Sequence, residues 1–203
     1  SLPRRDRRQE TGSESGQTRG GMKRIGILAA LVLFGGCAKT PHVFPLKKGW
    51  SATYEVTGAF FPQVEEIEVL RASTVAGVPG WVLGGALGES RVAWKDGVLV
   101  AEQLAGTWYA PPLPILRSAS GDEEWRGVAV TLGLAKAISG TFVQREEKVE
   151  FADRKTQSTH VVLDLSEPGA KIEIQIWYVK GLGPIRWEHR RNTALVQKAV
   201  ILR

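Results

Sequence analysis

Cys37 is the residue whose chemistry can be read most directly from its neighbours. It is the only cysteine in the 203-residue chain, and it follows the segment Leu33-Phe34-Gly35-Gly36. A deprotonated thiol is a nucleophile and can accept a lipid as a thioether. Small residues before it allow an extended chain to enter a peptidase site. Because a second cysteine is absent, the folded part must be stabilised by its core rather than by an intramolecular disulfide.

The residues before Cys37 have the layout of a secretory signal. Met22-Lys23-Arg24 is followed by the uncharged run 25–36. A positive start and an apolar run of about 7–15 residues are typical of a signal peptide, whereas a transmembrane helix needs about 20. With Cys37 at its end, the segment resembles a bacterial lipobox, in which the cysteine receives a diacylglyceryl group before cleavage. Phe34 stands where the usual pattern has leucine.

Three histidines are the obvious candidates for acid–base or metal chemistry. His42 precedes the predicted domain, and His160 and His189 lie within predicted strands. No pair of them has metal-ligand spacing, and the chain has no Gly-x-Ser-x-Gly nucleophile motif. We therefore expect exposed strand histidines, no catalytic residue, no bound metal and no cofactor.

Three acidic clusters offer carboxylates: Glu65-Glu66-Glu68, Asp122-Glu123-Glu124 and Glu146-Glu147-Glu150. On a strand, Glu66 and Glu68 share one face, so paired carboxylates for acid–base chemistry are geometrically feasible. Asp122-Glu123, in a predicted loop, lacks the alternating oxygen ligands of a calcium loop. We favour a solvated sheet face on which Lys and Arg balance these charges.

The chain is predicted to have four parts. Residues 1–21, dense in Arg, Gly, Ser and Glu, cannot bury enough apolar surface to fold. They are either untranslated sequence upstream of a true start at Met22, which we favour, or a disordered leader. Residues 22–36 form the lipoprotein signal peptide, residues 37–43 a tether, and residues 44–203 a single β domain of ordinary size.

The charge of the predicted domain gives no reason to expect a nucleic acid partner. The whole chain carries a formal +6, but residues 1–24 account for about +4 of it, leaving about +2 from Cys37 onward. A charge of that size gives a weak, mixed field. The Arg-rich start also lacks the interleaved aromatic residues that would stack on bases.

Segments with β character recur at short intervals along the predicted domain. Alternation is plain in Lys171-Ile172-Glu173-Ile174-Gln175-Ile176-Trp177, where every second side chain is apolar, so one face is buried and the other is wet. We predict strands over residues 50–56, 64–72, 81–87, 90–94, 98–104, 124–131, 141–151, 157–165, 171–179, 185–191 and 194–202.

The connections carry turn chemistry. Lys95-Asp96-Gly97 is a hairpin signal, because Asp and Gly tolerate positive φ, and Glu167-Pro168-Gly169 has a similar role. Residues 111–116 (PPLPIL) must be extended or polyproline-like. Residues 131–139 (TLGLAKAIS) are the one segment that could make a turn or two of helix, although Gly133 weakens it.

Three stretches together resemble a group of poorly characterised bacterial lipoproteins. They are residues 44–54 (FPLKKGWSATY), 109–116 (YAPPLPIL, leading to Trp125) and 177–186 (WYVKGLGPIR). The resemblance implies an antiparallel sheet curved into a half-barrel around a helical or loop plug, similar to the LolA/LolB-type carriers, whose relatives bind acyl chains. Gly181 and Gly183 in the third stretch predict a tight or bulged link between strands, and no dinucleotide site, because no helix-opening pattern follows.

Seven tryptophans are scattered across the predicted sheet: Trp50, Trp81, Trp94, Trp108, Trp125, Trp177 and Trp187. We favour a role as bulky core residues. The alternative is an apolar groove lined by aromatic side chains and suited to a lipid tail.

The sequence thus predicts a mainly β, non-catalytic lipoprotein, held to a membrane through a lipid on Cys37 and binding a lipid or other apolar ligand within a curved sheet. The expected location is the extracytoplasmic side of the cell envelope, at the outer membrane or cell surface. The first alternative is a structural or assembly lipoprotein with a filled core that binds an envelope protein partner. An extracytoplasmic hydrolase ranks last.

Overall fold

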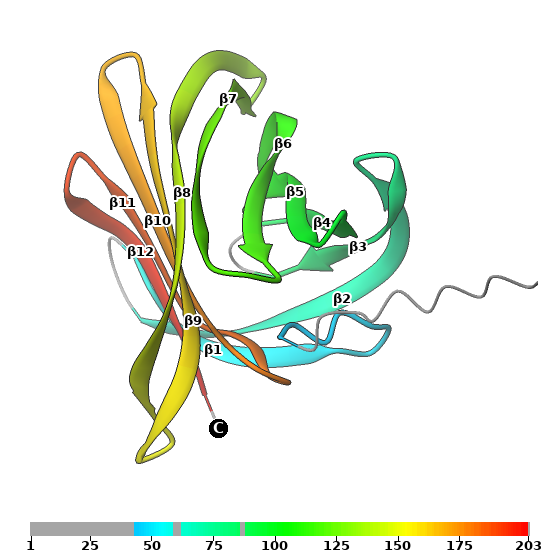
Figure 1. Ribbon diagram of the computed structural model, residues 1–203, viewed down its shortest axis with the longest axis vertical. Helices are drawn as coiled ribbons and strands as arrows, with labels where there is room; N and C mark the ends of the chain where they lie inside the picture. Colours follow the sequence, from blue (N-terminus) through cyan, green and yellow to red (C-terminus); the bar gives the residue numbers. More distant parts are fainter. Residues whose placement is uncertain (1–42, 59–61, 86–87, 203) are drawn as a thin grey trace, which may run out of the picture. The chain divides into compact units, whose positions relative to one another are not determined.

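A computed structural model describes residues 43–58, 62–85 and 88–202 of the chain. The chain divides into two units, residues 1–38 and 39–203, and the described residues belong to the second. Every regular element among them is a strand (Figure 1). No helix long and apolar enough to cross a membrane occurs in these residues. The strands are β1 (Ser51–Thr57), β2 (Gln63–Val75), β3 (Val78–Gly84), β4 (Ser90–Lys95), β5 (Val98–Leu104), β6 (Thr107–Arg117), β7 (Gly121–Thr131), β8 (Leu134–Phe151), β9 (Arg154–Glu167), β10 (Ala170–Val179), β11 (Gly183–Arg191) and β12 (Ala194–Ile201).

The twelve strands form one closed antiparallel barrel, in which each strand pairs with its neighbours along the chain. The prediction of a mainly β, antiparallel curved sheet is confirmed. The sheet curves further than a half-barrel, because β1 also pairs with β12, with Tyr54 opposite Ile201 and Val56 opposite Ala199. Closure gives both terminal strands a partner.

The predicted strands correspond to eleven of the twelve observed ones, and the missing strand is β6. Residues 111–116 of β6 are extended, as expected. Their prolines lack a backbone N–H, so the strand cannot pair without interruption. β6 pairs with β7 through Trp108, Tyr109 and Ala110, and its pairing with β5 has two shifts of register.

The predicted helical turn at residues 131–139 is wrong. Leu132 and Gly133 form the turn between β7 and β8, with φ of 50° and 79°, and β8 begins at Leu134. The ladder of β7 with β8 runs from Thr131 opposite Leu134 to Gly121 opposite Gln144, and this pairing overrides a weak helix propensity. The predicted turn at Asp96-Gly97 is confirmed, with φ of 50° and 78°.

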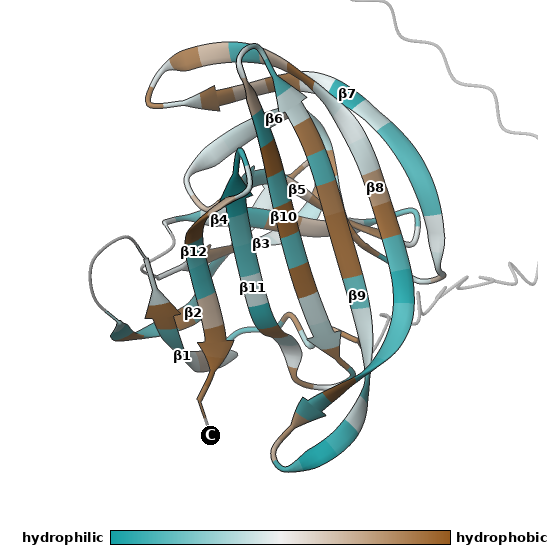
Figure 2. Ribbon diagram, turned by 90° about the vertical axis from the view of Figure 1, so that its left-hand side faces the viewer, coloured by the Kyte–Doolittle hydropathy of each residue, from teal (hydrophilic) through white to brown (hydrophobic). Residues whose placement is uncertain are grey.

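Hydrophobic and hydrophilic residues alternate along β10 (Figure 2). Their apolar side chains meet those of neighbouring strands in the main core, where Phe142 of β8, Leu165 of β9 and Ile176 of β10 are fully buried. Alternation at period 2 is what directs one set of side chains inward.

A loop before β1 packs against this core. Phe44 is buried, with its ring centroid 5.0 Å from that of Trp50 and 6.2 Å from that of Tyr178. A Cβ at Gly183 would lie 2.6 Å from the Phe44 ring, so the glycine makes room for it. Gly181 and Gly183 both have positive φ, and the β10–β11 ladder has a shift of register nearby, as predicted for a bulged link.

Candidate functional site

A pocket of about 310 Å³ opens at one end of the barrel, and we call it the mouth pocket. The turns β7–β8, β9–β10 and β11–β12 lie together at this end, at the top of Figure 1. Side chains of eight consecutive strands, β5 to β12, line it. Its apolar wall includes Leu104, Ala129, Ile138, Ile172 and Ile174.

Charged side chains are grouped at the mouth pocket. The carboxylate of Glu167 has a side-chain exposure of 5% and accepts a hydrogen bond from Lys136 Nζ at 3.1 Å. Arg191 Nη2 donates to the same oxygen of Glu167. Two cations thus share one carboxylate, and the three side chains carry a net charge of about +1.

Two further titratable groups line the same pocket and are uncharged at neutral pH. Burial, together with the negative charge of Glu167, raises the pKa of Tyr109 to about 12. Burial and the positive charge of Arg191 lower the pKa of His189 below its usual value. The positive charge of Arg191 and Lys136 is therefore balanced within the lining by Glu167 alone.

The strand pattern explains why apolar and charged groups meet here. On β9, Leu163, Leu165 and Glu167 alternate on one face, so the last inward position of the strand is charged. On β11, Trp187 and His189 are followed by Arg191 at the same spacing. Each strand therefore changes from an apolar to a charged side chain as it reaches the mouth of the barrel.

A second, smaller cavity of about 80 Å³ lies beside the loop before β1, and we call it the plug cavity. Phe44, Trp50 and Tyr178 contribute to its almost wholly apolar wall. Trp187 lines both the plug cavity and the mouth pocket. Its Nε1 is buried and has no hydrogen-bond partner among the described residues, although buried N–H groups are normally bonded.

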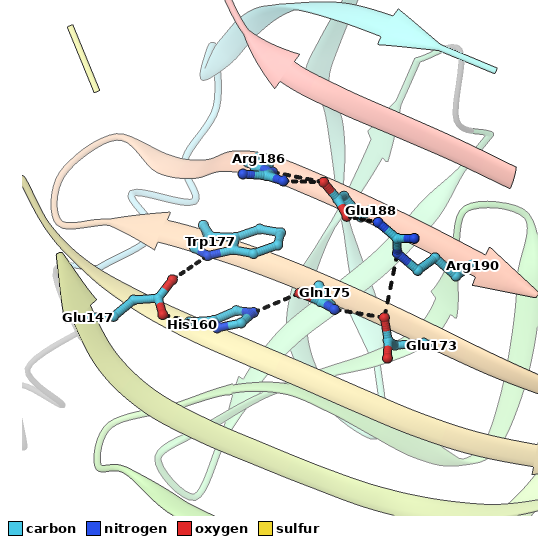
Figure 3. A network of polar contacts seen from close by, with 8 residues as sticks. All are labelled: Glu147, His160, Glu173, Gln175, Trp177, Arg186, Glu188 and Arg190. Atoms are coloured by element: carbon cyan, nitrogen blue, oxygen red, sulfur yellow. Dashed lines mark hydrogen bonds and ion pairs between the residues drawn. The ribbon is translucent and has the colours of Figure 1, made fainter. Parts of the chain in front are cut away.

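The outer face of β9–β11 carries a polar network (Figure 3). The Trp177 indole lies between the His160 ring, at 4.3 Å and 9° to it, and the Arg186 guanidinium, at 4.4 Å. Trp177 Nε1 donates to Glu147. Both faces of the indole are therefore covered, so this tryptophan offers no free face for stacking on a ligand.

Glu188 is the centre of the network in Figure 3, since it accepts hydrogen bonds from Arg186 and Arg190. Burial alone would raise the pKa of Glu188, but the bonds and positive charge of both arginines outweigh it and hold the pKa below its usual value. Glu188 is therefore an ionised carboxylate that links two arginines of its own strand, rather than a proton donor.

The two strand histidines are less exposed than predicted. His160 and His189 are half-buried rather than exposed, because one stacks on Trp177 and the other lines the mouth pocket. Cys37 and His42 lie outside the described residues. Within residues 43–58, 62–85 and 88–202, no group of three His, Cys, Asp or Glu side chains could hold a metal ion.

The acidic clusters mostly behave as a solvated, balanced surface. Glu66 and Glu68 are exposed on β2. The second cluster lies on β7 rather than in a loop, because β7 begins at Gly121, and its members pair with arginines. These pairs are Asp122 with Arg145, Glu123 with Arg117 and Glu124 with Arg126.

Most of the tryptophans are buried, as predicted for bulky core residues, but Trp108 is 40% exposed. Trp125 is buried in the main core, and Trp81 and Trp94 pack against it. Trp50 and Trp187 are also buried, but they line the cavities described above. Of the seven tryptophans, Trp50 and Trp187 are thus the ones that line these two cavities.

The sequence matches no protein-family model and no curated protein. Solved structures do resemble its fold. A protein of Bacteroides fragilis described as a "putative exported protein with YmcC-like fold" aligns with a TM-score of 0.48 and 16% identity over 80% of this chain and 98% of its own. The "hypothetical lipoprotein YmcC" of Escherichia coli aligns with a TM-score of 0.40 and 10% identity over 76% and 84%.

A "putative lipoprotein" of Parabacteroides distasonis aligns with a TM-score of 0.50 and 12% identity, over 79% of this chain and 97% of its own. None of the three names refers to LolA/LolB carriers, so that part of the resemblance stays a prediction. At this level of identity the likeness concerns the architecture, and the described barrel shares its fold with the Parabacteroides distasonis protein.

Proposed function

We propose that this chain is a non-catalytic lipoprotein, anchored through Cys37 on the extracytoplasmic side of a membrane, whose barrel binds a lipid or other apolar ligand in the mouth pocket. The observation that carries the binding role is the mouth pocket, a space of about 310 Å³ at the end of a closed barrel, whose wall combines apolar and charged side chains. The export and anchoring role is supported by the lipobox-like segment, and agrees with the name of the Parabacteroides distasonis protein.

The size of the mouth pocket supports an occupant. An apolar cavity of about 150 Å³ is enough to hold benzene, and pockets for small ligands start at about 300 Å³. Its inner apolar wall, which includes Ile138 and Ile174, would be covered by such an occupant. We therefore place ligand binding ahead of a filled-core assembly lipoprotein.

Anchoring is tested at Cys37. Cells that produce the full chain should yield protein that partitions into the detergent phase of a Triton X-114 extract, whereas the Cys37→Ser variant should remain in the aqueous phase. The reason is that an oxygen nucleophile cannot replace the thiol that takes the lipid, and several acyl chains hold a protein firmly. If the two proteins partitioned equally, Cys37 would not be the site of a lipid anchor.

Binding is tested with N-phenyl-1-naphthylamine, a neutral apolar dye whose fluorescence rises in apolar surroundings. We expect saturable binding at one site. Ala129 is buried and lines the mouth pocket, so Ala129→Trp should fill the pocket and weaken binding by at least about tenfold, or about 1.4 kcal/mol.

The matched control is the neighbouring residue, since Val128 is 39% exposed and Val128→Trp should leave dye affinity unchanged. Circular dichroism establishes that both variants are folded. If the wild-type protein binds no dye, the filled-core alternative replaces ligand binding. If Ala129→Trp binds as well as wild type, the mouth pocket is not the site.

A further inference from the structure

We propose that the ligand is an anionic amphiphile, whose charged head group binds at Lys136 and Arg191 and whose apolar tail lies against the inner wall of the mouth pocket. This inference rests on the proposed function and specifies the class of ligand. It follows from the charges at the pocket and from the direction in which the lining changes polarity.

The charge of the site favours an anion. Lys136 and Arg191 both bond Glu167, whose carboxylate is almost wholly buried between them. The side chains of Lys136 and Arg191 are 42% and 48% exposed. A lysine has three N–H donors and an arginine five, so both keep donors beyond those bound to Glu167. A ligand carboxylate or phosphate would accept from these donors and offset the unbalanced positive charge.

The lining also gives the ligand a direction. Glu167 and Arg191 are the last residues of β9 and β11, so the charges lie where the strands end. Further along the same barrel, Ile172 and Ile174 of β10 face the pocket, and Leu104 and Trp187 line both this pocket and the plug cavity. A molecule with a charged head and an apolar tail matches this order, whereas a uniformly apolar one would leave the charges without a partner.

Three ligands with the same ten-carbon tail test the inference: decanoate, decanol and decyltrimethylammonium, each titrated below its micelle concentration into the full protein by displacement of the naphthylamine dye. Decanoate should bind about tenfold more tightly than decanol, as expected for one charge-assisted contact. The cationic ligand should bind most weakly.

Two variants change the charge in opposite directions. Arg191→Gln removes the net positive charge and should abolish the preference for decanoate over decanol. Glu167→Gln adds one net positive charge and should increase that preference by several-fold. Lys148→Gln is the matched control, because Lys148 is exposed on the β8–β9 hairpin, away from the mouth pocket. Lys148→Gln should leave the preference for decanoate over decanol unchanged. Decanol affinity should stay constant in all three variants.

Each result is decisive. Opposite changes in the decanoate preference, with constant decanol affinity, support the inference. Equal binding of decanoate and decanol by the wild-type protein overturns it and leaves the proposed function standing. Parallel loss of both ligands in Arg191→Gln and Glu167→Gln also overturns it, since the cluster would then act on the fold rather than on the ligand. If no ligand binds, the inference and the proposed function both fail.

Discussion

Replacing Gly140 with alanine should lower the free energy of unfolding by about 3 kcal/mol, near the upper range for forced overpacking. A Cβ at Gly140 would lie 2.0 Å from the carbonyl oxygen of Asp164 and 2.8 Å from Cα of Leu165. Both are backbone atoms of β9, the strand that pairs with β8 at this point. Because backbone cannot move aside as a flexible side chain can, the two strands must separate locally. Urea unfolding followed by tryptophan fluorescence measures the change.

Gly121→Ala is the matched control. Gly121 also lies on a strand, β7, but a Cβ there would meet no atom within 4 Å. Its free energy of unfolding should stay within about 0.5 kcal/mol of wild type, as for most surface changes. If the two variants were equally stable, the close approach of β8 and β9 at Gly140 would not exist in solution.

The sequence predicted the local parts of the fold well, because their causes are local. The alternation in β10 depends on residues two apart, and the turn at Asp96-Gly97 depends on two neighbouring residues that accept positive φ. β6 escaped prediction for a local reason too, since its prolines are unfavourable in a strand. Residues 131–139 looked helical only because their partner strand was not visible in the sequence.

Closure of the barrel could not be predicted in this way. It depends on β1 pairing with β12, which brings Tyr54 opposite Ile201. Neither β1 nor β12 has a sequence pattern that would identify the other strand, far away along the chain, as its partner. An open and a closed curved sheet have the same alternating pattern, so the sequence supported curvature without fixing how far the sheet would curve.

The mouth pocket escaped prediction for a related reason. Lys136, Glu167 and Arg191 are each the charged residue near a strand end, and such residues are usually solvated. Only the register of β8, β9 and β11 brings them to one place. The spacing of His189 from Trp187 was a usable sign that both face inward, because residues two apart on a strand share a face.

Phe44→Ala should lower the free energy of unfolding by about 3–5 kcal/mol, the usual range for a buried Phe reduced to alanine. The Phe44 side chain is 4% exposed and packs on Trp50 and Tyr178. Gly183 has no side chain where the ring lies, so this residue cannot fill the space that the ring would leave. Phe44→Leu keeps most of the apolar volume, so it should lower the free energy of unfolding by only about 1 kcal/mol. A much smaller loss for leucine than for alanine would show that the packing of the Phe44 side chain is what stabilises the fold.

Phe44→Ala also distinguishes the roles of the two cavities in ligand binding. Phe44 lines the plug cavity but not the mouth pocket, and the link of β10 with β11 beside it lies at the opposite end of β10 from Glu167. Phe44→Ala should therefore enlarge the plug cavity while leaving the preference for decanoate over decanol intact in protein that remains folded. If the preference disappeared with Phe44, the head group would lie beside the plug rather than at Lys136 and Arg191. If stability did not change at all, the folded core would begin after this residue, and the loop before β1 would belong to the tether.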